Sequence, residues 1–292
     1  MKRLRRVLVG TDFTSGAVRA ARRALRLPLA PAATVELIHA VPRIAPRAFE
    51  AGVKEAALAA LDRQAAGLAR GDAASGLRVR KALASGPPAE ALAREARARR
   101  SELVVIGPRG GSGLPDLDLG STAERLLAES SVPVLIVRRG PGRPYRHAMV
   151  AVDLGGSSEG ALALALRLVA DGSRRITLLH AVDLPPESGI RLAGTSAEES
   201  ERLRGRRWDE AERLLATRTR QLTRRGFVVD SALSDGDARS VILAAARRLH
   251  ADLVALGTRR THDRTGFLIG SVARWVARRA PCDVLVARMP GD

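Results

Sequence analysis

The chain of 292 residues contains two copies of one unit, and this repeat constrains the fold more than any other feature of the sequence. Residues 5–27, RRVLVGTDFTSGAVRAARRALRL, match residues 146–168, RHAMVAVDLGGSSEGALALALRL, so that Asp12 aligns with Asp153. Residues 119–137 match residues 269–287 in the same order. A unit of about 145 residues is the size of an ordinary domain. We therefore expect two domains, 1–140 and 145–292, linked by the Gly- and Pro-rich stretch GPGRP.

Each copy alternates between the periodicity of strands and that of helices. In the first copy, apolar runs typical of strands occupy residues 7–11, 34–41, 77–84, 102–107 and 132–137, and helical spacing occupies residues 14–27, 47–69, 88–100 and 121–130. This alternation predicts an α/β fold with a mostly parallel, doubly wound sheet and helices on both faces. The second copy is longer by nine residues, which fall between His180 and Gly236.

A glycine-rich stretch joins the fourth predicted strand to the last helix of the first copy. Residues 107–122 read GPRGGSGLPDLDLGST, with five glycines in sixteen positions. Such a stretch is either a plain flexible loop or a cradle for an anion, since backbone amides at a helix N-terminus favour phosphate. The hydroxyl groups of Ser121 and Thr122 can donate to the same ligand, and Asp12 follows the first strand at the same edge of the sheet.

Composition restricts the other partners of the chain. The net charge of +18 is spread over both halves, with 24 basic and 13 acidic residues in 1–142 and 25 and 18 in the remainder. Both a generally basic surface and a polyanion site agree with this charge. Aromatic residues make up 2%, so base stacking is not expected and nucleic acid is a weak candidate. The single Cys282 excludes an intrachain disulfide, and no apolar stretch approaches about 18 residues, so we expect a cytoplasmic protein without a membrane partner.

The pattern G-x-x-G-(nine residues)-G-[ST] is complete in the first copy, at Gly107, Gly110, Gly120 and Ser121. The sequence lacks the Walker motif GxxxxGK[ST], and no GxGxxG follows a predicted strand. Together with TDFT after the first strand and the closing run VPVLIV, the pattern resembles the ATP-binding branch of the universal stress protein family. The resemblance covers the whole chain as a tandem of two such domains.

This resemblance implies two Rossmann-like domains, each with a five-stranded sheet, and binding of ATP, AMP or ADP, with or without Mg²⁺. Asp12 and the backbone near Ala40 would contact the adenosine, and the phosphates would lie on Gly107, Gly110, Gly120, Ser121 and Thr122. Arg109 either reaches the phosphates or adds to the basic surface. The last strands, VPVLIV and CDVLVA, would pair as an intrachain pseudo-dimer, with a homodimer and an unknown protein partner also open.

The second copy keeps Asp153, Gly257, Gly270 and Ser271 but has Arg260 in place of the second glycine. If that position needs a left-handed backbone, a non-glycine residue costs about 1–2 kcal/mol, or about a tenfold loss in affinity. Arg260 could instead supply charge to a phosphate. We expect one competent nucleotide site per chain, in the first copy, and at most a weaker one in the second.

Several other residues have both a functional and a structural interpretation. Asp116 and Asp118 either help to hold Mg²⁺ or form a solvated pair in the loop. His39 and His180 recur at one strand position, which favours a repeated packing role over catalysis. His262, beside Asp263, either touches a ligand or is exposed, and Cys282 has the position of a small buried residue.

The leading hypothesis is a nucleotide-binding stress or regulatory protein without catalytic residues. A slow ATPase or phosphotransferase is the first alternative, and a basic nucleic-acid-binding protein is the second.

Overall fold

The computed structural model of the chain describes residues 2–41, 47–69, 77–110, 119–140, 143–169, 173–183, 196–258, 261–263, 266–268 and 270–288. The first copy forms the elements β1 (Leu4–Gly10), α1 (Ser15–Leu25), β2 (Leu29–Val41), α2 (Arg47–Ala69), β3 (Arg78–Ser85), α3 (Pro88–Ala98), β4 (Leu103–Ile106), α4 (Ser121–Glu129) and β5 (Val134–Ile136). The predicted strands and helices of this copy are confirmed, and the main difference in length is that β2 begins five residues earlier than its apolar run.

The second copy repeats this order with two additions. Its elements are β6 (His147–Ala151), α5 (Glu159–Leu168), β7 (Arg175–Val182), α7 (Ala197–Arg224), β8 (Val228–Asp235), α8 (Ala238–Arg248), β9 (Leu253–Thr258), β10 (Thr261–Asp263), β11 (Gly266–Leu268), α9 (Ser271–Arg279) and β12 (Asp283–Arg288). Helix α7 has 28 residues against 23 in α2, so part of the extra length of the copy extends this helix. The antiparallel pair β10–β11 was not predicted.

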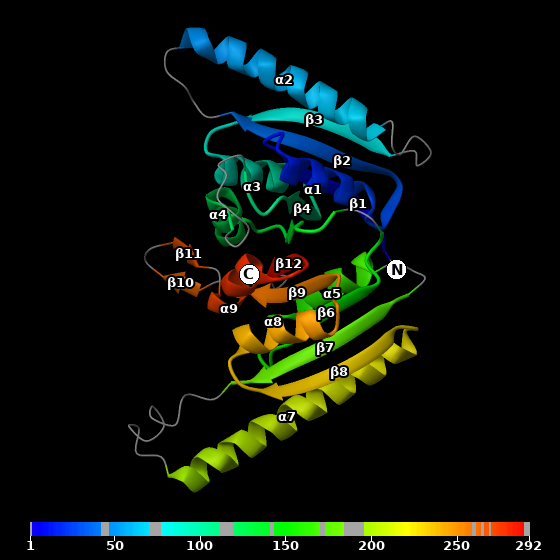
Figure 1. Cartoon of the computed structure of the whole chain (residues 1–292), viewed down its shortest axis with the longest axis vertical. Coiled ribbons are helices and arrows are strands. Elements are labelled where there is room, and N and C mark those ends of the chain that lie inside the picture. Colours follow the sequence, from blue (N-terminus) through cyan, green and yellow to red (C-terminus); the bar gives the residue numbers. More distant parts are fainter. Residues whose placement is uncertain are drawn as a thin grey trace.

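Ten of the strands form one continuous sheet in the order β3-β2-β1-β4-β5-β12-β9-β6-β7-β8, and β10 and β11 form a separate pair. In the ten-stranded sheet all neighbours from the same copy are parallel, and the strand order reverses where β1 lies between β2 and β4. The last strands β5 and β12 pair antiparallel, with Leu135 opposite Leu285, so the two copies meet at the centre of the sheet as the family resemblance implied. Helices α2 and α7 lie along the outer strands at the two far ends (Figure 1). The predicted α/β fold is therefore confirmed.

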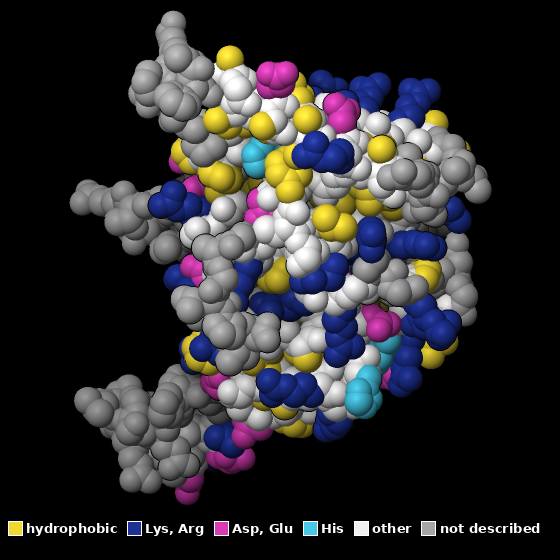
Figure 2. All heavy atoms as spheres, turned by 45° about the horizontal axis from the view of Figure 1, so that its top comes forward, with side chains coloured by type: hydrophobic (Ala, Val, Ile, Leu, Met, Phe, Trp, Pro, Cys, Tyr) yellow, Lys and Arg dark blue, Asp and Glu magenta, His cyan; other side chains and the backbone are white. Residues whose placement is uncertain are grey.

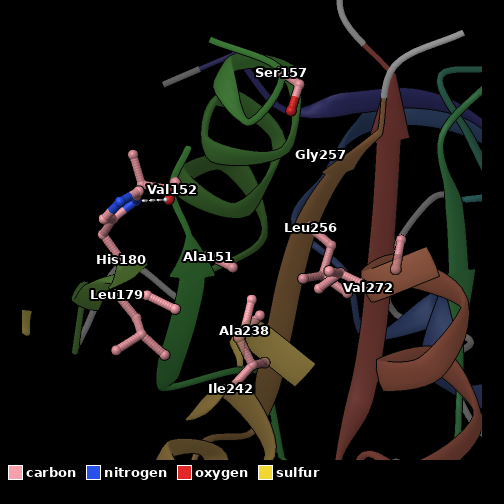
Figure 3. A pocket seen from close by; sticks show the side chains of 12 residues that line it. Ala151, Val152, Ser157, Leu179, His180, Ala238, Ile242, Leu256, Gly257 and Val272 are labelled. Carbon is pink, nitrogen blue, oxygen red and sulfur yellow. Dashed lines mark hydrogen bonds between the residues drawn. The ribbon is translucent and has the colours of Figure 1, made fainter. Parts of the chain in front are cut away.

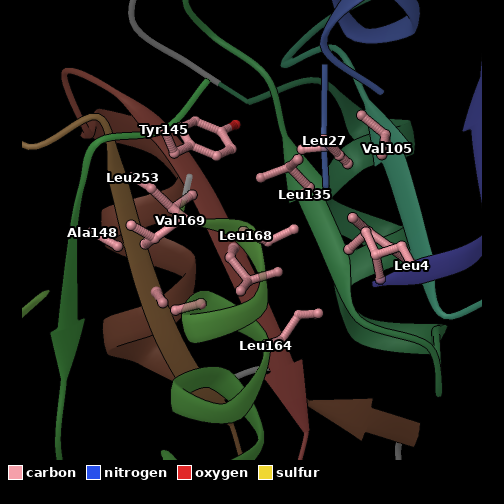
Figure 4. Close-up of a cluster of buried hydrophobic side chains, with 14 of the residues drawn as sticks. Leu4, Leu27, Val105, Leu135, Tyr145, Ala148, Leu164, Leu168, Val169 and Leu253 are labelled. Carbon is pink, nitrogen blue, oxygen red and sulfur yellow. The ribbon is translucent and has the colours of Figure 1, made fainter. Parts of the chain in front are cut away.

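Both faces of the sheet are buried at its centre, which explains why strands such as β4, β5 and β9 are almost continuously apolar, whereas the residues of the outer strands β3 and β8 are mostly exposed or half-buried. One core cluster includes Val7, Leu37 and Leu61, and on the other face Leu8, Ile38 and Leu126 belong to a second cluster. Each cluster contains residues of both copies, as Figure 4 shows for Leu4 and Leu135 of the first copy packed near Leu168 and Leu253 of the second. The two copies thus share their hydrophobic cores. None of the helices in the described residues is both long and apolar enough to cross a bilayer.

Candidate functional site

A cavity of about 560 Å³ opens at the carboxyl ends of β1, β2 and β4, where the strand order of the first copy reverses. This is the position at which open α/β sheets bind ligands, and the volume lies in the range of about 300–1,000 Å³ usual for small-molecule sites. The structure brings every predicted site residue of the first copy to its wall: Asp12, Ala40, Gly107, Arg109, Gly110, Gly120, Ser121 and Thr122.

The three pattern glycines are needed because the backbone passes very close to its neighbours. A Cβ atom on Gly107 would lie 2.9 Å from the carbonyl carbon of Gly16 in α1, and one on Gly120 would lie 3.2 Å from Cα of Arg109. A Cβ on Gly110 would lie 2.5 Å from Oδ2 of Asp12. The φ angle of Gly110 is outside the left-handed region, so the expected backbone reason for this glycine was wrong. Its role is to allow close approach to Asp12.

Asp12 is held in place by the turn between β1 and α1. Its Oδ1 accepts hydrogen bonds from the amide nitrogen of Thr14 at 3.1 Å and from the Thr14 hydroxyl at 2.6 Å. Thr14 in turn caps α1 by accepting from the amide of Ala17. Phe13, between them, has a left-handed φ of 67°, a strained conformation for a bulky residue. The two hydrogen bonds from Thr14 hold the Asp12 carboxylate at the rim of the cavity, where its Oδ2 lies close to Gly110.

The opposite part of the cavity is apolar. Its lining includes Ile38 and Ala40 from β2, Leu92 from α3, Ile106 from β4 and Leu119 before α4. Pro88 and Leu92 also line the cavity and were not predicted, because they are apolar and do not directly follow a strand. The sequence PAEAL, at the start of a helix beside this edge, is the signal that could have indicated them. The cavity therefore combines an apolar side with a side of glycine backbone and hydroxyl groups.

Arg109 brings positive charge to the glycine side of the cavity, whereas Arg138 lies outside the cavity wall and donates to carbonyl oxygens of α9. Arg109 lines the cavity, and it lies close enough to Arg138 to affect its titration. Burial, and then the charge of Arg109, lower the pKa of the Arg138 guanidinium from its ordinary value.

His39 lines the cavity, and its imidazole makes a structural contact. Its Nδ1 lies 2.8 Å from the carbonyl oxygen of Thr11, and its ring packs 4.5 Å from that of Phe13. A carbonyl oxygen only accepts, so Nδ1 carries the proton and donates it. His180 repeats this contact with the carbonyl oxygen of Val152 at 2.7 Å, which agrees with the predicted packing role of the repeated histidine.

The corresponding cavity of the second copy is much smaller, at about 120 Å³ (Figure 3). Of the four residues predicted for a weaker second site, Gly257 lines this cavity, and Asp153, Gly270 and Ser271 are not part of its wall. A Cβ on Gly257 would lie 2.1 Å from the carbonyl oxygen of Ser157, so the turn before α5 closes onto the end of β9. Figure 3 shows Ser157 above Gly257 at the mouth of this cavity.

Asp153 has a different environment from Asp12. Its Oδ1 accepts from the amide of Ser158 at 2.9 Å and its Oδ2 from the amide of Ser157 at 3.2 Å, so both oxygens are used within the turn. Burial alone would raise the pKa of this carboxyl, but the hydrogen bonds from Ser158 and Ser157 outweigh it and lower the pKa. Helix α5 begins at Glu159, three residues after Gly156, which aligns with Ser15, the first residue of α1. Gly156 itself has a left-handed φ of 77° and lies in the turn before α5.

Some sequence-based interpretations concern positions that lie outside the described residues. These are Arg260, the paired Asp116 and Asp118, and the side chains of His262 and Asp263. Within the described residues, no group of three His, Cys, Asp or Glu side chains could hold a metal ion. On the face shown in Figure 2, Lys and Arg side chains are scattered among other residues and do not gather into one stripe.

Comparison with known proteins gives the family. The family model described as "Universal stress protein family" matches the chain twice, over residues 3–138 and 144–288. A universal stress protein of Mycobacterium tuberculosis is 33% identical over 197 residues, which is 64% of this chain and 61% of that protein. A universal stress protein of Thermus aquaticus is 32% identical over 133 residues, 45% of this chain and 97% of the relative. The matched part of this chain thus spans about three fifths of the mycobacterial relative's length.

Among solved structures, a universal stress protein from Archaeoglobus fulgidus has a TM-score of 0.74 and 18% sequence identity, with 99% of this chain and 100% of that chain covered. At this identity the likeness concerns the fold alone. The two matches to the family model, each covering one copy of the repeat, show that the chain is a tandem member of the universal stress protein family.

Proposed function

We propose that the chain binds an adenine nucleotide, ATP or its lower phosphates, in the cavity of the first domain and acts in a stress response through this binding. One observation carries the proposal: the eight residues predicted for the site surround one cavity of about 560 Å³. Four of them form the glycine pattern, and the others are Asp12, Ala40, Arg109 and Thr122. The combination of an apolar side with the N-terminus of α4 and the hydroxyls of Ser121 and Thr122 suits a base attached to phosphates.

The arrangement suggests a role for each part of the wall. The base would lie against Ile38, Ala40 and Leu92, and the ribose would donate to Oδ2 of Asp12. The phosphates would lie at the N-terminus of α4, near Gly110 and the hydroxyls of Ser121 and Thr122, with Arg109 adding charge. Asp12 is the one carboxylate among the described lining residues, so Mg²⁺ would arrive bound to the phosphates instead of in a protein cage.

We also propose that the second domain holds no equivalent nucleotide. Its cavity of about 120 Å³ is below the usual range for ligand sites, and both oxygens of Asp153 are already occupied by the turn before α5. The second domain would then support the first domain instead of binding a nucleotide itself.

The test is mass spectrometry of the small molecule that copurifies with the full chain, followed by calorimetric titration of the stripped protein with ATP, ADP, AMP and GTP. An adenine nucleotide released on denaturation, and tighter binding of ATP than of GTP, support the proposal. A stripped chain that gives no heat with any adenine nucleotide at millimolar concentration contradicts it.

A further inference from the structure

Helix α4, whose first residues line the candidate site, is held along its length by side chains of the second domain. Glu124 lies one turn after Ser121 and contacts two arginines of α9: Arg278 donates from Nε at 2.5 Å, and Arg274 from Nη2 at 3.3 Å. At the other end of α4, Arg288 of β12 donates to the carbonyl oxygen of Ala128. Figure 1 shows α4 and α9 facing each other where the two copies meet.

The contacts are partly reciprocal, because Arg138 of the first domain holds the end of α9. Its Nη2 donates to the carbonyl oxygens of Ala277 and Arg278, the latter at 2.7 Å. Arg138 and Arg288 are aligned residues of the two copies. The charge between the helices is not symmetric, since Glu124 of α4 aligns with Arg274 of α9. Pairing two copies of the first domain would place Glu124 against another acid, so these contacts suit a first domain facing a second.

Glu124 also has an electrostatic consequence for an anion at the site. A carboxylate one turn from Ser121 and Thr122 repels a phosphate bound there unless its charge is neutralised. Arg278 and Arg274 supply this neutralisation, and the carboxylate side chain is 21% exposed, so solvent screens it only in part.

We propose that Arg278, supported by Arg274 and Arg288, is a positioning residue for phosphate binding in the first domain: it anchors α4 and cancels the charge of Glu124. This inference rests on the proposed nucleotide site. It gives the second domain, whose corresponding cavity measures only about 120 Å³, a defined part in binding. Because the effect acts on the phosphate end, it should increase with the number of phosphates on the ligand.

The experiment compares the dissociation constants of ATP, AMP and adenosine for the full chain and its variants by calorimetry. We expect Arg278→Ala to weaken ATP binding by about fivefold or more, AMP binding less, and adenosine binding not measurably. Arg278→Lys should recover most of the ATP affinity, because a cation returns to Glu124. The matched control is Arg175→Ala, which breaks the 3.0 Å ion pair with Asp230 at the outer strands of the second domain and should leave all three constants unchanged.

Equal ATP affinity in the wild type and Arg278→Ala would overturn the inference. An equal loss of affinity for adenosine and for ATP would also overturn it, because such a loss indicates general loosening of the domain. If Arg278→Ala does not fold, Arg274→Ala, whose side chain is 52% exposed, tests the same order of ligands with a smaller expected loss. A wild-type chain that binds none of the three ligands would overturn both this inference and the proposed function.

Discussion

Gly110 approaches Asp12 so closely that a Cβ atom at position 110 would lie 2.5 Å from Oδ2 of the carboxylate. Real Cβ contacts are essentially never that short, so a side chain at position 110 would have to displace the Asp12 carboxylate, whose Oδ1 accepts hydrogen bonds from the amide and hydroxyl of Thr14. The pair links the two parts of the proposed site, the carboxylate after β1 and the glycine loop after β4. The second copy has Arg260 at the position aligned with Gly110.

Replacing this glycine is the first test of the link. We expect Gly110→Ala to weaken ATP binding by about tenfold, equivalent to about 1.4 kcal/mol, because Asp12 must leave the position that accepts the ribose. Gly110→Arg, which copies the second domain, should weaken it further. Titration calorimetry measures both, with Gly140→Arg as the matched control, since nothing lies within 4 Å of a Cβ there. ATP binding by Gly110→Arg with wild-type affinity would disprove the proposed role of this glycine.

The junction of the two copies depends on Asp283, which is fully buried on β12. Its carboxylate pairs with Nε of Arg23 at 3.2 Å, accepts from the hydroxyl of Tyr145 at 2.6 Å and accepts from the amides of Arg138 and Arg139. Removing one partner of a buried ion pair leaves the other charge uncompensated, at a cost of about 3–5 kcal/mol.

We therefore expect Asp283→Ala to lower the free energy of unfolding by about this amount, measured by urea denaturation. Asp230→Ala, which breaks an ion pair whose two side chains are about half exposed, should cost about 0–1 kcal/mol. Similar losses in the two variants would show that the buried cluster is not the main anchor between the copies.

His147, at the start of β6, should make stability depend on pH. Its Nε2 lies 2.8 Å from the Thr177 hydroxyl, and burial, followed by the charge of Arg175, lowers the pKa of the imidazole below its ordinary value of 6.5. The unfolded chain therefore binds a proton more readily than the folded chain. The contribution of neutral His147 to the free energy of unfolding is therefore complete above pH 6.5 and is lost as the pH falls through the pKa of the folded state. The free energy of unfolding should fall by no more than about 1.4 kcal/mol per pH unit through this group. In His147→Gln this part of the pH dependence between pH 7 and 5 should disappear, and an unchanged curve would contradict the assignment.

The single thiol should be unreactive in the folded protein. Cys282 is fully buried, and burial, followed by the charge of Asp283, raises its pKa to about 12. The thiolate is the reactive form, so at pH 8 only about one molecule in ten thousand is reactive even before access is considered. Mass spectrometry should find no alkylation by iodoacetamide in the native chain and complete alkylation in urea. Rapid labelling of the native chain would show that the segment just before β12 is open.

Much of the fold could be predicted because it depends on local periodicity and on the repeat. Helix α2 covers the residues predicted for it, 47–69, since its helical spacing runs without a break between turn residues. Asp12 and the glycines Gly107, Gly110 and Gly120 line one cavity, and this could be predicted from a general property of parallel sheets. The carboxyl ends of parallel strands lie at the same edge of the sheet, so residues that follow different strands meet there.

The features that were missed depend on distances between residues far apart in the sequence. Asp283 aligns with Pro133 of the first copy, so comparing the copies gave no sign of its buried role with Arg23. The pattern identified Gly110 as special, but only the three-dimensional distance to Asp12 shows that close approach, and not a left-handed backbone, is the reason. The closure of Ser157 over Gly257 likewise appears only when β9 and the turn before α5 are placed together.

The central claim, one nucleotide site per chain in the first domain, is tested most directly by the stoichiometry of ATP binding to the full stripped chain. Native mass spectrometry of the wild type should show one ATP per chain at saturation, and Gly110→Arg should lose it. Disrupting the second domain's turn with Asp153→Ala should leave the count at one. Two ATP molecules bound with equal affinity to the wild type, or one that persists in Gly110→Arg, would contradict the account.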